Sequence, residues 1–324
     1  MKPLNTEKRA AILQCLTEGM SVRGTSRITG ASTNTILDLL ERVGEACSAY
    51  QDENLRGLER CDDIQLDEIF SFVGCREKSK KRAKGNHPGE VWCWVALCAK
   101  TKLRITWHVG ERNHRAGMAF CHDLSQRVSA ISQVTSDGLQ SYRFAMASAM
   151  PRAQFAQLVK VYESTADRRD IVVRADKCPQ FGDPDPAHIS TSFIEASNLH
   201  LRMTNRRYAR QTNAHSKKLE NHCHMLAVIF MAYNFCRKHT TLKTTPAMAA
   251  GVADRQWSME DVIRMSDEYH EAKLSERFEA AFEARFTPKR QLPKSYTPTP
   301  KDKLPLPWYL DPNGTPPAGE SESP

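Results

Sequence analysis

Three acidic residues that are far apart in the sequence occupy positions from which a sheet and a helix could bring them together. Asp67 lies inside 64–74, a stretch rich in β-branched and aromatic residues that predicts a strand. Asp137 ends a shorter predicted strand, 133–138, at an Asp-Gly turn. Glu195 lies in the first two turns of a predicted helix. If the two strands are neighbours, the aspartates meet at one edge of the sheet, and a helix packed beside them delivers the glutamate.

Convergent carboxylates indicate a cation site, because they repel one another and raise each other's pKa unless a divalent ion neutralises them. Hard oxygen ligands favour Mg²⁺ or Mn²⁺. Two such ions about 4 Å apart activate a water or a 3′-hydroxyl and stabilise the leaving oxygen of a phosphodiester. The sequence therefore predicts a Mg²⁺ or Mn²⁺ site in which Asp67, Asp137 and Glu195 are both metal ligands and catalytic residues.

Two alternatives remain open for these acids. Each of them, taken singly, is more often structural than catalytic. Glu68 also competes with Asp67, because side chains alternate along a strand and the two residues lie on opposite faces. Periodicity does not choose between them.

The elements that must position these acids predict an α/β fold with a mixed sheet flanked by helices. Strands that alternate with helices after an antiparallel meander are typical of such a sheet. The expected strands cover 64–74, 91–101, 103–110, 133–138 and 154–163. The expected helices cover 114–130, 141–150, the segment that carries Glu195, 213–239 and 257–286.

Two segments lack a regular hydrophobic period. Gly and Pro cluster in 164–190, so a loop or insertion is expected there. The segment 287–324 is rich in proline, which sustains neither a helix nor the interior of a sheet. We therefore expect this C-terminal tail to be extended or disordered.

Residues 1–50 predict a helix-turn-helix. A first helix ends before Gly19, Ser21 is a suitable N-cap for a short second helix, and Gly30 ends that helix ahead of a third. This succession is typical of DNA-binding modules, whose last helix presents short polar side chains to base edges. An ordinary three-helix bundle with a polar surface is the alternative.

Basic and short polar side chains near these elements are the candidate DNA contacts. One group flanks the second and third helices, another lies in the basic segment 76–85 after the first strand, and a third follows Glu195. The full set is Arg23, Arg27, Ser32, Asn34, Thr35, Lys80, Lys81, Arg82, Arg202, Arg206 and Arg207. A solvated charged loop is the alternative for the second group.

The composition agrees with a polyanionic partner. The formal net charge is +8 and the sequence pI is about 9.0, which favours DNA without proving it. None of the ten cysteines belongs to a Cys-x-x-Cys pair, which argues against a structural zinc site. The chain has no apolar signal core and no apolar run of about 18 residues. We therefore expect a cytoplasmic, nucleoid-associated bacterial protein with no membrane partner.

Several long segments carry a family resemblance. They are MKPLNTEKRAAIL at the start, DEIFSF (67–72), VGER (109–112), TSDG (135–138), HISTSFIEASNLHLRM (188–203), RQTNAHSKKLENH (210–222) and YNFCRKHTTLKTTPAMAAG (233–251). Together they resemble the DDE transposases of the insertion-sequence-one type over roughly residues 1–265.

The resemblance implies a metal-dependent enzyme that cleaves DNA strands and transfers them, with Asp67 rather than Glu68 in its catalytic triad. It implies two DNA partners, the terminal inverted repeats of the element and the target DNA, with Arg202 in contact with the element end. Bridging two ends requires a homo-oligomer. The domains it implies are a helix-turn-helix at 1–50, an RNase H-like catalytic domain at 60–250 with the loop or insertion at 164–190, a helical extension at 251–286 and the tail at 287–324.

The sequence departs from this family beside the catalytic glutamate. Members usually read Glu-Arg-Gln-Asn where this chain has Glu195-Ala196-Ser197-Asn198, so an arginine and a glutamine that could hold DNA are missing. A catalytically decayed DNA-binding relic is therefore an alternative. A metal-dependent nuclease on the same fold is another.

Overall fold

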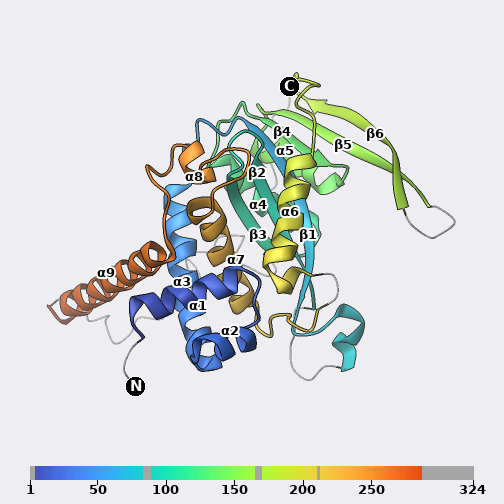
Figure 1. The fold of residues 1–324 in the computed structure, drawn as a ribbon. Helices are drawn as coiled ribbons and strands as arrows, with labels where there is room; N and C mark the ends of the chain where they lie inside the picture. Colours follow the sequence, from blue (N-terminus) through green and yellow to red (C-terminus); the bar gives the residue numbers. More distant parts are fainter. Residues whose placement is uncertain (1–3, 83–88, 165–169, 210–211, 287–324) are drawn as a thin grey trace, which may run out of the picture. The chain divides into compact units, whose positions relative to one another are not determined.

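The computed structural model describes residues 4–82, 89–164, 170–209 and 212–286. The chain divides into two compact units between Ala272 and Lys273. The first unit contains a sheet with helices on both faces and a helical N-terminal region (Figure 1). This confirms the expected α/β fold with a mixed sheet flanked by helices, and the arrangement is compatible with an RNase H-like fold. The finer domain boundaries stay predictions.

Six strands form one sheet in the order β3-β2-β1-β4-β5-β6. The strands are β1 (Asp63–Val73), β2 (Gly89–Cys98), β3 (Arg104–Gly110), β4 (Gln133–Asp137), β5 (Gln154–Ser164) and β6 (Asp170–Phe181). β1, β2 and β3 form an antiparallel meander, β4 and β5 run parallel to β1, and β6 is antiparallel to β5. β1 is therefore an inner strand, with β2 on one side and β4 on the other.

Strand β6 shows that the expectation of a loop or insertion over 164–190 was wrong for much of that segment. β6 pairs with β5 from end to end, so β5 is not the last strand. The prediction gave more weight to Gly and Pro than to the β-branched run Ile171, Val172 and Val173. The strand tolerates Pro179 because it lies at the edge of the sheet, where a missing N–H breaks no inner ladder.

The helices pack on both faces of the sheet. They include α4 (His114–Ser125), α5 (Gln140–Ala149), α6 (Ser192–Thr204), α7 (Leu219–Met231) and α8 (Pro246–Ala249). On the face of α4 and α5, the ring of Trp94 from β2 lies 5.2 Å from that of Tyr142. On the opposite face, Trp107 of β3 lies 6.3 Å from Phe230 of α7. α6 lies on this second face, against β1 (Figure 1).

The helix expected over 213–239 is shorter than predicted. α7 covers Leu219–Met231 and continues as a π-helical turn, Ala232–Cys236. Asn234 explains the distortion, because its side chain pairs with the backbone of Arg104 on β3. Its Oδ1 accepts from the Arg104 N–H at 3.0 Å, and its Nδ2 donates to the Arg104 carbonyl at 2.9 Å.

The three helices expected over 1–50 are present as α1 (Thr6–Thr17), α2 (Val22–Thr29) and α3 (Thr33–Asn54). The side chains of Asn5, Ser21 and Ser32 cap their N-termini, and Gly30 ends α2 in the left-handed region at φ 67°. α3 packs closely along α7 at Gly44, where an added Cβ would lie 2.4 Å from the Cβ of His224.

Helix α9 (Met259–Phe286) starts in the first unit and ends in the second. In the first unit Val262 and Ile263 are buried, and the Asp267 carboxylate accepts from Arg9 at 2.8 Å. In the second unit Leu274 and Phe278 are exposed. None of the helices in the described part of the chain combines the length and apolar composition that a bilayer crossing needs. The tail predicted at 287–324 lies outside the described residues.

Candidate functional site

The pairing of β1 with β4 brings two of the predicted acids side by side. The two strands run parallel, and Leu66 is the partner of Ser136, so the next residues along them are Asp67 and Asp137. β4 ends at Asp137, whereas β1 continues to Val73. The first and fourth strands are therefore neighbours, as the expectation required, and the two aspartates lie side by side where β4 ends rather than at an edge of the sheet.

One carboxylate oxygen from each of Asp67, Glu68 and Asp137 lies within 4.8 Å of the other two. The donor set consists of hard oxygens and carries negative charge, which fits a divalent cation such as Mg²⁺ or Mn²⁺. Glu195 lies outside this close group, but its charge acts on it by raising the pKa of Asp137. The structure therefore brings Asp67 and Asp137 together with Glu68, and leaves Glu195 outside this close group.

Glu68 approaches the site from the other face of β1. Its side chain is only 2% exposed, and its Oε1 accepts from Arg112 Nε at 2.7 Å. The hydroxyl of Tyr142 donates to its Oε2 at 3.0 Å. Arg112 also lies 3.9 Å from the Asp137 carboxylate and stacks over the ring of Trp92. The guanidinium of Arg112 thus lies against the buried carboxyl group of Glu68 and compensates its negative charge.

Arg112 is one of the site residues that the sequence pattern did not identify. Its signal was present in the segment VGER (109–112), which carried the family resemblance without a role for its arginine. Arg112 follows β3, which is separated from β4 by two strands, so only the folded sheet brings it to Glu68 and Asp137.

The carboxylates of this site are poised to bind a cation. Burial raises the pKa of Asp67 to about 7, with a further contribution from the charge of Glu68. Burial also raises the pKa of Asp137, against a hydrogen bond from the Leu139 N–H and the nearby guanidinium of Arg112. A raised pKa means that the ionised carboxylates are destabilised where they are, and a bound cation would offset that cost.

Glu195 is held by two partners in this structure. Its Oε1 accepts from Lys160 Nζ of β5 and from the Thr191 hydroxyl. Its side chain is 43% exposed, more than that of Asp137 at 38%. Lys160 therefore neutralises part of the charge that Glu195 brings to the site.

Ser197, which departs from the family pattern, and Asn198, which keeps it, have structural roles in this fold. Ser197 accepts two hydrogen bonds from the buried Arg104, at 2.9 Å to its Oγ and 2.9 Å to its carbonyl oxygen. The guanidinium of Arg104 also lies 3.9 Å from the ring centroid of Tyr233. Asn198 is buried and donates to Oδ2 of Asp67 at 2.8 Å. Ser197 and Asn198 thus fasten α6 to the sheet.

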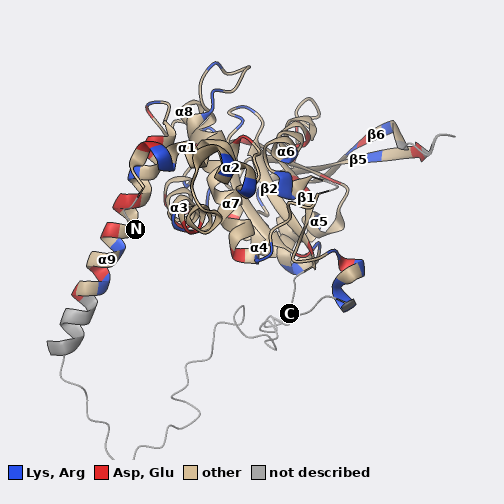
Figure 2. Cartoon of the chain, turned by 60° about the horizontal axis from the view of Figure 1, so that its bottom comes forward, with Lys and Arg blue, Asp and Glu red and all other residues tan. Residues whose placement is uncertain are grey.

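The DNA contacts predicted in the N-terminal helices are largely accessible. Arg23 and Arg27 are exposed on α2, and Asn34 is exposed in the first turn of α3. Ser32 and Thr35 are engaged with each other, because the Ser32 Oγ caps α3 and lies 2.8 Å from the Thr35 hydroxyl. Figure 2 shows Lys and Arg on α2.

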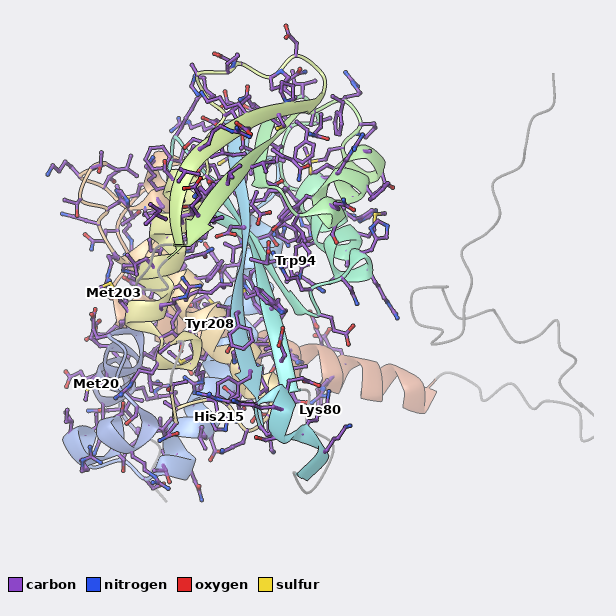
Figure 3. The ribbon with its side chains drawn as sticks, turned by 90° about the vertical axis from the view of Figure 1, so that its right-hand side faces the viewer. Met20, Lys80, Trp94, Met203, Tyr208 and His215 are labelled. Atoms are coloured by element: carbon purple, nitrogen blue, oxygen red, sulfur yellow. The ribbon has the colours of Figure 1, made fainter. Side chains whose placement is uncertain are left out.

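The second group lies in η1 (Glu77–Arg82), a 3-10 turn after β1. Lys80 and Lys81 are exposed, and Lys80 lies 3.5 Å from Glu77. The side chain of Arg82 lies outside the described residues. Lys80 is near the same end of β1 as His215 (Figure 3).

The third group differs in accessibility. Arg206 is exposed and Arg202 is half-buried. Arg207 is held inside the fold, because its Nε donates to the Ser216 hydroxyl at 2.8 Å and burial lowers its pKa to about 10. Its guanidinium supports the chain at Ser216 and is poorly placed for DNA.

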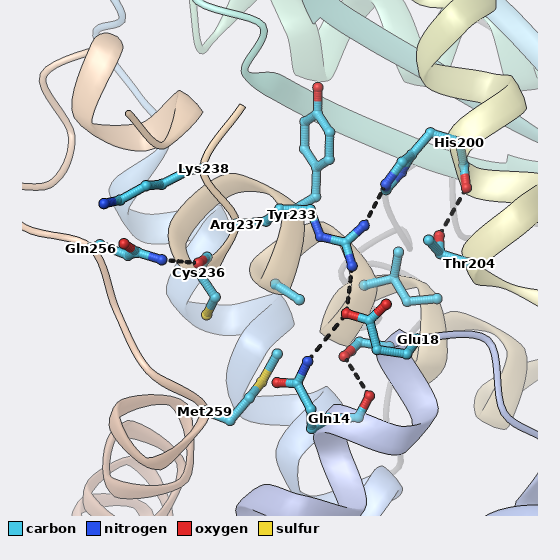
Figure 4. A pocket seen from close by; sticks show the side chains of 13 residues that line it. Gln14, Glu18, His200, Thr204, Tyr233, Cys236, Arg237, Lys238, Gln256 and Met259 are labelled. Atoms are coloured by element: carbon cyan, nitrogen blue, oxygen red, sulfur yellow. Dashed lines mark hydrogen bonds and ion pairs between the residues drawn. The ribbon is translucent and has the colours of Figure 1, made fainter. Parts of the chain in front are cut away.

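A separate cavity of about 270 Å³ lies between α1, α6 and the turn after α7 (Figure 4). Arg237 crosses it, donating to Glu18, the residue that follows α1, and to Nε2 of His200 on α6, the latter at 2.7 Å. Burial, with the charges of Arg104 and Arg237, lowers the pKa of His200 to about 4. None of the predicted acids lines this cavity, so it joins the N-terminal helices to α6 without being part of the carboxylate site.

Comparison with known proteins adds little to this geometry. No protein-family model matches the chain, and no curated protein matches it. Among solved structures, one similar to it is a pre-cleavage Mos1 transpososome, with 14% sequence identity and a TM-score of 0.19. The match covers 48% of this chain and 60% of that one, less than two thirds of its length. A TM-score this low does not establish a shared fold.

Proposed function

We propose that this protein is a metal-dependent DDE transposase of the insertion-sequence-one type, which cleaves and transfers DNA strands. The observation that carries the proposal is the placement of Asp67 and Asp137 in register on neighbouring parallel strands, with Glu195 close enough to act on Asp137. Such an arrangement of oxygen ligands is suited to cations that act on phosphodiesters.

In this proposal Asp67, Asp137 and Glu195 hold the cation. When bound, Mg²⁺ or Mn²⁺ would polarise the phosphate and lower the pKa of an attacking hydroxyl. Arg112 favours the ionised form of Glu68, against the burial that raises the pKa of this carboxyl, and lies 3.9 Å from the Asp137 carboxylate. Asn198 orients one oxygen of Asp67 and leaves the other for a ligand. Lys160 must give up its contact with Glu195 for that carboxylate to turn toward the aspartates.

The proposed partners are the terminal repeats of the element and its target DNA, bound by a homo-oligomer. The exposed Arg23, Arg27 and Asn34 on the N-terminal helices are the proposed contacts to base edges and phosphates. Lys80, Lys81, Arg202 and Arg206 are the proposed phosphate contacts outside the N-terminal helices, and binding through them should weaken as salt rises.

The test is cleavage of a supercoiled plasmid that carries candidate element ends, with and without Mg²⁺. Asp67→Asn, Asp137→Asn and Glu195→Gln should each abolish strand cleavage and joining while end binding is kept. Asp254→Asn, at an exposed position away from the acids, is the matched control and should cleave normally. A triad variant that still cleaves at the normal rate would remove that residue from the mechanism.

A DNA-binding relic is the second candidate, favoured by one observation. Glu195 is paired with Lys160 and lies outside the group of oxygens within 4.8 Å. If the unaltered protein binds the ends but never cleaves them in Mg²⁺ or Mn²⁺, the relic is the correct description. Cleavage that does not depend on the ends would instead indicate a nuclease.

A further inference from the structure

Helix α6 starts without a cap from its own N-cap residue. Within the described part of the chain, the Thr191 side chain makes no capping hydrogen bond. Its hydroxyl donates to Oε1 of Glu195 instead. Because the first N–H groups of a helix have no partner inside the helix, they must be satisfied from outside. The first turn of α6 therefore needs acceptors from elsewhere.

Gln65 of β1 supplies the missing acceptor. Its Oε1 accepts from the N–H of Phe193 at 2.9 Å and from the N–H of Ile194 at 3.0 Å. Gln65 is only 1% exposed, so water cannot take over this role. A side chain 128 residues away in the sequence thus does the work of an N-cap.

The remaining N–H groups of this turn are satisfied locally. The Ser190 hydroxyl accepts from the Ser192 N–H at 3.2 Å, and the Thr191 carbonyl accepts from the Glu195 N–H at 3.0 Å. With Gln65 in place, the whole first turn has acceptors. The Thr191 hydroxyl is then available to hold Glu195 rather than the backbone.

One face of β1 carries a series of polar side chains toward α6 and the turn that follows it. Gln65, Asp67 and Ser71 alternate along the strand and so share a face. Gln65 binds the first turn of α6, Asp67 accepts from Asn198 one turn later, and the Ser71 hydroxyl donates to the carbonyl of Arg207 at 2.8 Å. β1, which carries Asp67, thereby sets the position of α6, which carries Glu195.

We propose that Gln65 is a positioning residue, which caps α6 from β1 and so sets the distance between Glu195 and the two aspartates. The inference rests on the proposed function, since it concerns the same site. Gln65 touches no substrate and acts only through α6 and Thr191. Its removal should therefore slow strand cleavage more than it weakens DNA binding.

The variant that tests the cap is Gln65→Met, which keeps the length of the side chain and removes the acceptor. Gln65→Glu keeps an acceptor oxygen at the same place. Gln51→Met is the matched control, because Gln51 of α3 is also buried and its amide donates to the backbone carbonyls of Cys47 and Ala227. Hydrogen exchange of the Phe193 and Ile194 amides, followed by NMR on the full-length protein, reports the cap directly.

In Gln65→Met these two amides should exchange about fivefold to thirtyfold faster than in the unaltered protein, the effect of losing a cap. Gln65→Glu and Gln51→Met should leave them protected. The rate of Mg²⁺-dependent cleavage by Gln65→Met should fall about tenfold to a hundredfold, since small displacements of catalytic groups cost that much. Its Kd for the ends should stay within about twofold, because phosphate contacts carry most of that affinity.

The two proposals fail in distinguishable ways. Unchanged exchange of both amides in Gln65→Met would show that Gln65 is no cap. Faster exchange with an unaltered cleavage rate would show that the cap does not position Glu195. Absence of metal-dependent cleavage in the unaltered protein would remove the proposed function and the positioning role with it, while the exchange measurement would still decide the cap.

Discussion

Asn198 of α6 donates from its Nδ2 to Oδ2 of Asp67 on β1, at 2.8 Å, and is itself only 3% exposed. This hydrogen bond joins the helix that carries Glu195 to the strand that carries Asp67. It also favours the ionised form of Asp67, against the burial that raises the pKa of this carboxyl. The Asn198 amide therefore holds α6 against β1 and also stabilises the ionised form of Asp67, a proposed metal ligand.

Replacing this amide should weaken the metal site. In Asn198→Ala, the Mg²⁺ concentration for half-maximal cleavage should rise about tenfold or more, the usual cost of losing a residue that orients a metal ligand. Titrating Mg²⁺ in the plasmid cleavage assay measures it. Asn54→Ala is the control, since Asn54 donates a similar bond to the Tyr50 carbonyl at the end of α3. An unchanged Mg²⁺ requirement would separate Asn198 from the metal site.

The pair of Arg112 and Glu68 should show strong coupling in stability. Arg112→Met leaves the carboxylate of Glu68, 2% exposed, without its guanidinium, and should lower the free energy of unfolding by about 2 kcal/mol. The cost is below that of a fully buried pair because the side chain of Arg112 is 41% exposed.

Urea denaturation of both single variants and of the double variant measures this coupling. Adding Glu68→Gln to Arg112→Met should restore part of the lost stability, because the buried group is then neutral. Additive losses in the double variant would show that the two side chains do not depend on each other.

His222 of α7 should make the protein less stable in acid. It is fully buried, its ring lies 4.9 Å from that of Tyr208, and neither ring nitrogen has a hydrogen-bond partner among the described residues. Burial first, and then the charge of Arg207, lowers its pKa to about 3. The folded state therefore holds His222 neutral, whereas the unfolded chain protonates it near its ordinary pKa of about 6.5.

Above pH 6.5 the titration of His222 does not reduce the free energy of unfolding. As the pH falls from 6.5 toward about 3, the free energy of unfolding decreases, because the unfolded state then binds more protons than the folded state. The loss is about 1.4 kcal/mol per pH unit within that window. Urea denaturation at pH 7 and pH 5 should show a shallower decline for His222→Leu than for the unaltered protein. Equal declines would mean that His222 does not contribute to acid sensitivity.

The exposed arginines of α2 should contribute to DNA affinity through phosphates or bases. Arg23→Ala and Arg27→Ala should each weaken end binding, and each lost phosphate contact should reduce the salt slope of log K by about one. Fluorescence anisotropy at several salt concentrations measures both quantities. Arg152→Ala, at an exposed position after α5, is the control. Unchanged affinity in both α2 variants would favour a plain helical bundle over a helix-turn-helix.

Local physics made much of the fold readable from the sequence. Ser21 is an expected N-cap in the sequence and caps α2 in the structure, because this cap lies next to the helix that it serves. Asp67 and Asp137 could be placed on strands for a similar reason, since β-branched neighbours and the Asp-Gly turn are local signals. Strand β6 was not predicted, because proline and glycine occur both in loops and in strands at the edge of a sheet, so their presence does not distinguish the two.

The sequence by itself determined which residues are acidic, where most of the strands and helices lie, and that Asp67 and Glu68 lie on opposite faces of one strand. Only the tertiary structure decided that β1 lies beside β4, that Arg112 neutralises Glu68, that Lys160 holds Glu195 and that Gln65 caps α6. Alternation along a strand separates two faces but carries no information about what packs on either. Each of these contacts joins elements that are distant in the sequence, so it forms only when the sheet and its helices have assembled.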